Sequence, residues 1–124
     1  MIYRLVIHRT LPGWNQLMDI ARGNKIQAAK EKKQVENQIQ IEARHQLRRI
    51  KFKEPVIMKY EWYEPNKRRD KDNIACARKY VQDALVKGGY LKNDGWKEIE
   101  GFSDKFFVDA ENPRVEVVIM EVEE

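Results

Sequence analysis

A short charged segment, Arg68-Arg69-Asp70-Lys71-Asp72-Asn73, carries the residues best suited to chemistry. It falls where a predicted strand passes into a predicted helix. Asp70 and Asp72 are two positions apart, and in an extended segment such side chains point the same way. Two neighbouring carboxylates repel each other unless a cation lies between them, and Mg²⁺ is commonly held by one or two carboxylates with water and substrate phosphate. The pair therefore predicts a metal site, flanked by basic side chains that can meet phosphates.

The same residues also have a simpler interpretation. Asp72 is a suitable N-cap for the helix that follows, and a charged loop is often only solvated. On a helical projection Asp72, Cys76, Lys79 and Asp83 share one side, opposite the apolar stripe of residues 74–85. Lys79 is then placed to stabilise a phosphoryl group or to hold a carboxylate. An ordinary solvated helix face has the same pattern and needs no function.

The elements that must position these groups follow from periodicity and turn residues. Gly23-Asn24 is placed to divide the first helical stretch in two, and Asn15 to cap it. The order β-α-β-α-β-β predicts a two-layer α/β (α+β) fold, a single domain over 1–124 with a mixed four-stranded sheet. We expect the last two strands to form a hairpin, and the last strand to be covered on both faces because its middle is apolar on both. The predicted elements are strands over 2–8, 56–63, 96–108 and 115–122, a helix-rich stretch over 16–50 and a helix over 72–87.

Charge is distributed unevenly along the chain. Residues 1–97 carry 22 Lys and Arg against 11 Asp and Glu, whereas residues 98–124 carry 2 against 9. Such asymmetry suggests an electropositive face toward a polyanion, and one face of the first long helix is basic. A single cysteine, Cys76, indicates a reducing, cytoplasmic compartment. The sequence has no apolar run long enough for a membrane span and no apolar segment typical of a signal peptide.

Three spaced motifs together resemble the RusA family of Holliday junction resolvases. They are Arg69-Asp70-Lys-Asp72-Asn73, Asp83-Ala84-Leu85 and Asn93-Asp94-Gly95. The opening segment Leu11-Pro12-Gly13-Trp14-Asn15 and the segment 113–117 are similar as well. The Asn93–Lys97 string is typical of versions from phages and prophages of Gram-positive bacteria.

This resemblance implies a compact homodimer that cuts branched DNA, with Asp70, Asp72 and Asp94 as three catalytic carboxylates holding Mg²⁺, which Mn²⁺ can replace. It also implies a helix lysine. The stretch from Asp72 to Asp83 is about three residues longer than in the founding bacterial member, so this lysine corresponds to Lys79 or to the Cys76 position. We take Lys79.

The predicted function is therefore that of a hydrolase, a crossover junction endodeoxyribonuclease acting in recombination and repair. Two other classes remain open: a non-catalytic nucleic-acid-binding phage regulator, and a nuclease with broader flap or fork specificity. The expected DNA contacts are Lys67, Arg68, Arg69, Asn73, Asn15, Lys33, Arg44, Arg48 and Lys51.

Overall fold

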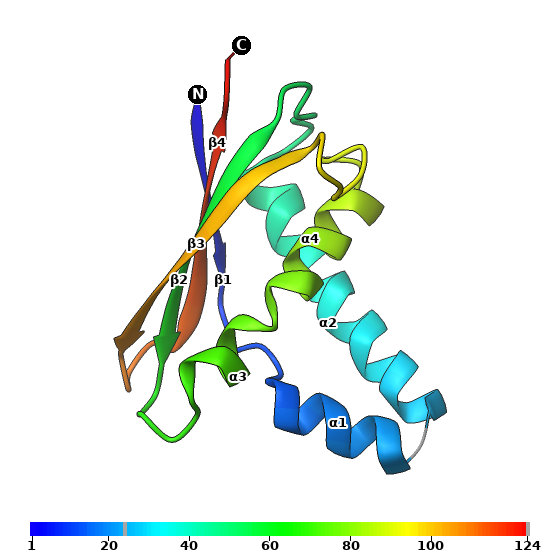
Figure 1. Ribbon diagram of the computed structural model, residues 1–124, viewed down its shortest axis with the longest axis vertical. Coiled ribbons are helices and arrows are strands. Elements are labelled where there is room, and N and C mark those ends of the chain that lie inside the picture. Colours follow the sequence, from blue (N-terminus) through cyan, green and yellow to red (C-terminus); the bar gives the residue numbers. More distant parts are fainter. Residues whose placement is uncertain (24, 124) are drawn as a thin grey trace.

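A four-stranded sheet carries all of its helices on one face, with α1 and the start of α2 projecting beyond the sheet (Figure 1). The computed structural model describes residues 1–23 and 25–123. This is the α+β arrangement predicted from the order of elements. The strands are β1 (Ile2–Ile7), β2 (Val56–Glu64), β3 (Ile99–Val108) and β4 (Arg114–Glu121), and the helices are α1 (Trp14–Gly23), α2 (Lys25–Gln46), α3 (Lys71–Ala75) and α4 (Arg78–Lys87).

The sheet is mixed, as predicted, with the strand order β1-β4-β2-β3. Strand β4 is antiparallel to both β1 and β2, and β3 is parallel to β2. The predicted hairpin between the last two strands is wrong, because β2 lies between them. Their short connection crosses the end of β2, where the Asp109 N–H donates to the Glu64 carbonyl at 2.8 Å. Turn residues mark where a strand ends, but they do not say which strand it pairs with.

Strand β3 is irregular near Gly101. Val56 pairs with Ile99 and the next residue, Ile57, pairs with Gly101, so the register shifts at this point. Glu100 is thus the extra residue of a β-bulge, a feature that bends and twists a strand locally.

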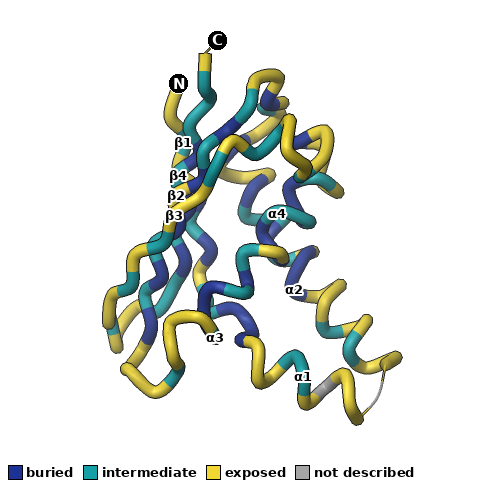
Figure 2. Tube along the Cα trace, viewed as in Figure 1, coloured by how far each residue is buried: buried dark blue, intermediate teal, exposed yellow. Residues whose placement is uncertain are grey.

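The core lies between the sheet and the helices, and the apolar stripes of α2 and α4 face it (Figure 2). Ile41 of α2 lies off its stripe and is 52% exposed. Burying these stripes against the sheet supplies most of the stabilisation of the fold. The buried stripe residues are Val35, Ile39, Ala43 and Leu47 of the first and Ile74, Ala77, Val81 and Leu85 of the second.

The other face of the sheet carries no helix, so the expectation that β4 is covered on both faces is wrong. Val118 and Met120 are half-buried there. Arg4 lies across from Val118 on this face and pairs with Glu61 at 2.9 Å and with Glu116 at 2.7 Å. The aliphatic stems of such residues cover apolar surface while their charges stay in water.

Both predicted helical stretches are divided. The first becomes α1 and α2, as predicted, although Asn24 itself lies outside the described residues. The helix predicted over 72–87 becomes α3 and α4, with a break at Cys76–Ala77 where i to i+3 hydrogen bonds replace the helical pattern, such as Tyr80 N–H to the Ala77 carbonyl at 3.0 Å. None of the described helices has the length and apolar character needed to cross a membrane.

Candidate active site

Two segments far apart in the sequence dock against each other to build the site. The loop after β1 runs past the start of α3, and a Cβ added at Gly13 would lie 2.8 Å from the Asn73 Oδ1. That oxygen accepts a hydrogen bond from the Asn15 N–H at 2.9 Å. Asn15 was expected to cap α1, but the side chain of Asn73 satisfies this end of the helix instead. Any side chain at position 13 would require Asn73 and Arg69 to shift.

Arg69 holds the loop between β2 and α3 in place. Its guanidinium binds both carboxylate oxygens of Glu64 at 2.8 Å and the Leu11 carbonyl at 2.9 Å. Glu64 is buried, so this bidentate pair is well shielded from solvent. Arg69 was expected to contact DNA. In the structure its hydrogen-bonding capacity is largely used to join β2 to the loop before α1, which is a positioning role.

Asp70 and Asp72 lie on the surface beside this junction. Asp72 is inside α3, not in an extended segment, and Asp70 occupies the N-cap position predicted for Asp72 without a capping side-chain bond. The Asp70 carboxylate has no protein partner within residues 1–23 and 25–123. That of Asp72 accepts only the N–H of Asn73, at 2.9 Å. Both carboxylates therefore keep most of their lone pairs free for another ligand.

These two carboxylates border two hollows of the surface. The Trp14 hollow, of about 350 Å³, is lined by Trp14, Asn15, Asn73 and Cys76 in addition to the two aspartates. The Phe106 hollow, of about 920 Å³, extends past them toward the end of β3 and is bordered by the cations Lys67, Arg69 and Lys71.

Asp94 lies in a separate cluster with Lys79 and Asp83. The Lys79 ammonium lies 2.7 Å from Asp94 and 3.0 Å from Asp83. The hydrogen bond from Lys79 is the main reason that the pKa of Asp94 falls below its usual value. The bond to Asp94, followed by that to Asp83, raises the pKa of Lys79. Lys32 of α2 also approaches Asp83, at 3.3 Å.

The predicted ligand set divides between these two places. In the part of the chain that the structure describes, no three Asp, Glu, His or Cys side chains lie close enough to hold one metal ion. Asp70 and Asp72 fit the oxygen donors that Mg²⁺ prefers, with open positions for water and phosphate. Asp94 is bound to Lys79 in this conformation and does not join them.

The helix break decides which residue meets Asp94. Three additional residues in a continuous helix would rotate the following side chains by roughly 300°, and the break at Cys76–Ala77 interrupts that rotation. Lys79 reaches Asp94, whereas the Cys76 thiol donates to the Asn73 carbonyl within α3 at 3.1 Å. Of the two positions that the sequence left open for the helix lysine, Lys79 is therefore the one that contacts Asp94.

The remaining basic side chains do not form one face. Lys67 and Arg68 are exposed beside Asp70, and Lys33 and Arg44 are exposed along α2. The face predicted on this helix also included Arg48 and Lys51. They lie beyond its end at Gln46 and are exposed in the following turn.

Exposed tryptophans accompany both halves of the site, and the sequence analysis gave them no role. Trp96 follows Asp94 by two residues and is 100% exposed, and Trp14 beside Asp70 is 53% exposed. Indole rings are common at interfaces because they combine a large apolar surface with a polar N–H. The sequence signal for these side chains was a tryptophan within each of two otherwise polar segments, one before α1 and one after Asp94.

The sequence matches a known protein family over most of its length. Residues 15–120 match the family described as Endodeoxyribonuclease RusA. The chain belongs to the RusA family. The matched range includes both halves of the site, the Asp70–Asp72 pair and the Lys79–Asp94 cluster. No curated protein gives a significant match to the sequence.

RusA membership makes the chain an endodeoxyribonuclease by family. Within the matched range, the carboxylates of Asp70 and Asp72 are left largely without protein partners beside the docked segments.

Proposed function

We propose that this RusA-family chain is a metal-dependent hydrolase that resolves four-way DNA junctions by cutting phosphodiester bonds. The observation that carries the proposal is the Asp70–Asp72 pair. Both carboxylates are exposed, largely without protein partners, and lie at the junction of two docked segments. Carboxylate oxygens left open in this way are the donors that Mg²⁺ prefers.

Mg²⁺, or Mn²⁺ in its place, would be held by Asp70 and Asp72 and would supply the acidity that activates water and neutralises charge on the phosphate. The protein's own part is positioning. Lys67 and Arg68 lie exposed beside the pair and are suited to binding backbone phosphates, which orients DNA without reading its sequence. Arg69 keeps the loop that carries them in place.

Lys79 and Asp94 supply the remaining groups. The Lys79 ammonium is largely exposed even though it binds two carboxylates, so a phosphate oxygen can take the place of Asp94. We expect Asp94 to turn toward the other two aspartates when that exchange occurs, and so to complete the three-carboxylate set. A homodimer would present two such sites to the two equivalent strands of a junction.

The direct test compares labelled four-way junction, replication fork and linear duplex, each with and without Mg²⁺. A junction resolvase cuts the junction in preference to the fork and only with metal. A regulator that only binds nucleic acid retards the substrates and cuts none, and a broader branch nuclease cuts forks and junctions alike. Either of these results contradicts the proposal.

Asp70→Asn assigns the activity to the site. The variant should bind the junction as the unmodified chain does and lose cleavage, because it removes a ligand charge and leaves the loop unchanged. Asp19→Asn, an exposed carboxylate on α1 that borders neither hollow, is the matched control and should cut normally. Undiminished cleavage by Asp70→Asn would remove Asp70 from the site.

A further inference from the structure

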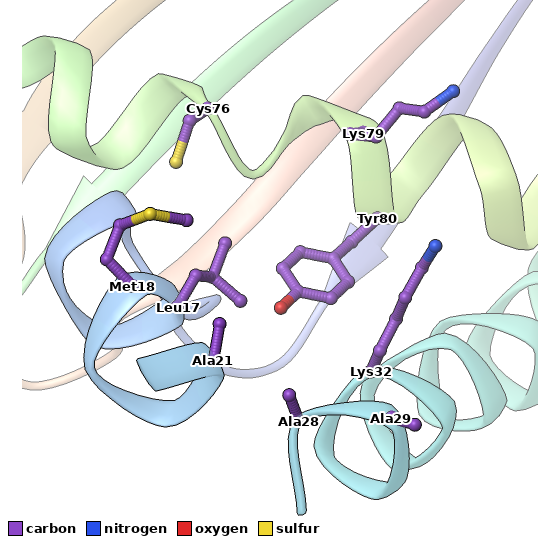
Figure 3. Close-up of a pocket in the computed structure, with 9 residues that line it drawn as sticks. All are labelled: Leu17, Met18, Ala21, Ala28, Ala29, Lys32, Cys76, Lys79 and Tyr80. Carbon is purple, nitrogen blue, oxygen red and sulfur yellow. The ribbon is translucent and has the colours of Figure 1, made fainter. Parts of the chain in front are cut away.

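A third hollow, the helix pocket, lies where α1, α2 and α4 meet. Its volume is about 340 Å³, and its walls are mostly carbon, from residues such as Met18 of α1, Ala28 of α2 and Tyr80 of α4 (Figure 3). Sites for small molecules usually measure roughly 300–1,000 Å³ and have apolar walls with a few polar groups. The helix pocket is therefore large enough for one flat ring system and too small for a helix.

The helix pocket adjoins both halves of the candidate active site. Cys76 lines it and also lines the Trp14 hollow that holds Asp70 and Asp72. Lys79 forms another part of its wall and binds Asp94 at 2.7 Å. A group that enters the pocket is thus connected on one side to the free carboxylates and on the other to the lysine cluster.

Tyr80 gives the helix pocket a polar group among its apolar walls. Its ring points into the space between α1 and α2 (Figure 3), and its hydroxyl shows no hydrogen bond to the described chain. Burial raises the pKa of this hydroxyl to about 12, so it stays protonated at neutral pH and can both donate and accept. The ring supplies a face for stacking, and Met18 supplies an adaptable apolar surface opposite.

Two lysines stand at the entrance, and both are paired with carboxylates, Lys32 with Asp83 and Lys79 with Asp83 and Asp94. The stems of Lys32 and Lys79 border the pocket, and their ammonium groups point away from its interior (Figure 3). A nucleotide places a ring beside an anionic phosphate, and that phosphate can reach Lys79 by displacing Asp94. The helix pocket is also continuous with the candidate active site through Cys76 and Lys79, so DNA held at that site is the occupant within reach.

We propose that the helix pocket receives one unpaired nucleobase of the branched DNA, with the phosphate of that nucleotide lying toward Lys79. This inference rests on the proposed function and adds a base-binding site to it. Taking a base out of a duplex costs least where its stacking is already interrupted, as at a branch point. The pocket thus selects branched over linear DNA, and the Tyr80 hydroxyl distinguishes bases by their polar edges.

Cys76 is the only cysteine in the sequence and makes the proposal testable by disulfide cross-linking. A four-way junction with an activated thiol tethered to one base at the branch point is mixed with the protein without metal. We expect one cross-link with the unmodified chain and none with Cys76→Ala. Ala28→Phe, which fills the pocket, should lose the cross-link and weaken junction binding about 5- to 150-fold, as for the loss of one stacked base.

Ala110→Phe, in the exposed turn between β3 and β4, is the matched control and should change neither value. Tyr80→Phe, which keeps the ring, should retain the cross-link and reduce the preference among bases at that position; this variant also guards against a folding defect in Ala28→Phe. An equal cross-link with Ala28→Phe would place the base in the Trp14 hollow and overturn the inference. So would the absence of a cross-link at every branch-point position.

Cleavage of the unmodified junction with Mg²⁺ is measured in parallel. Cleavage without a cross-link overturns the base site alone and leaves the nuclease proposal standing. A cross-link that the Ala28→Phe variant loses, in a protein that never cuts, supports the base site and contradicts the nuclease proposal.

Discussion

Gly13 shows how much of the site depends on one missing side chain. The backbone at this position passes the Asn73 carbonyl at a distance of 3.0 Å from where a Cβ would lie, and the Arg69 guanidinium at 2.9 Å. These are the residues that hold Asp70 and Asp72 in position. The demand on Gly13 is steric, since its backbone is not in the left-handed region.

Gly13→Ala should therefore disturb the docking of the two segments. We expect the free energy of unfolding to fall by about 1–3 kcal/mol, the usual cost of overpacking, and junction cleavage to fall more than junction binding. Urea unfolding and gel assays measure the two effects. Gly101→Ala is the control, because a Cβ there meets nothing within 4 Å; equal losses in both variants would contradict the steric account.

Lys79→Gln tests the electrostatics of the second cluster. The hydrogen bond from Lys79 lowers the pKa of Asp94, so in the variant this pKa should return toward its ordinary value, as carbon NMR titration would show. A depressed carboxyl pKa stabilises the fold above the unfolded-state value of about 3.9 and loses that effect as pH falls through the folded pKa. The variant should therefore lose less folding stability on acidification than the unmodified chain. The difference should be small because the pair is exposed. An unchanged Asp94 pKa would contradict the assignment.

At the scale of elements, an ion pair between a buried carboxylate and a largely exposed lysine joins α2 to α4. Glu36 is 2% exposed, and its Oε1 accepts a hydrogen bond from Lys87 at 2.6 Å. Its Oε2 is buried without a partner in the described structure. A buried carboxylate with one charged partner depends strongly on that partner.

Lys87→Met should lower the free energy of unfolding by about 1–3 kcal/mol, because it leaves the buried Glu36 unpaired. The double variant Glu36→Met/Lys87→Met should recover most of that loss, since no buried charge remains. Denaturant unfolding of the single and double variants completes a double-mutant cycle. A double variant less stable than the single would show that the pair itself is stabilising.

The end of α2 offers a second test, because Arg48 adopts the left-handed conformation with a φ of 58°. A residue other than glycine is strained there. Arg48→Gly should raise the free energy of unfolding by about 0.5–1 kcal/mol, net of glycine's extra entropy in the unfolded chain. Arg48→Lys, which keeps the charge and the strain, is the control. If Arg48 contacts phosphate, the glycine variant should also bind the junction more weakly while melting at a higher temperature.

At the scale of the whole molecule, the charge asymmetry of the sequence becomes an asymmetry of layers. The acidic stretch after residue 97 forms mainly β3 and β4, and three of its carboxylates, Asp104, Asp109 and Glu116, are paired with arginines. Most of the basic excess lies on the helices, on the loop before α3 and on the segment 48–53 that follows α2. DNA should therefore approach from the side of the helices and the Asp70 loop, and added salt should weaken its binding.

Paired incision is the prediction that belongs to this scale. If the active species is a homodimer with two sites, a cruciform plasmid should be converted mainly to linear product in one binding event. Heterodimers with one Asp70→Asn subunit should leave mainly nicked circles. Sedimentation should show a particle of two 14.8 kDa chains. A monomer that nicks without linearising would contradict the dimer.

The sequence by itself determined the local features. The apolar stripes of α2 and α4, the strand positions and the division of the first helical stretch all follow from periodicity and from glycine or proline, which act over a few residues. The Asp70–Asp72 pair was visible for the same reason, since both carboxylates and their basic neighbours lie within one short segment.

Only the tertiary structure decided what depends on contacts between distant segments. It placed β2 between β3 and β4 and split the helix at Cys76–Ala77. It paired Arg69 with Glu64 and Lys79 with Asp94. It also formed the helix pocket from three helices. Strand pairing and ion pairing are selected by the energy of the whole packed arrangement, and that energy is not contained in any single stretch of the chain.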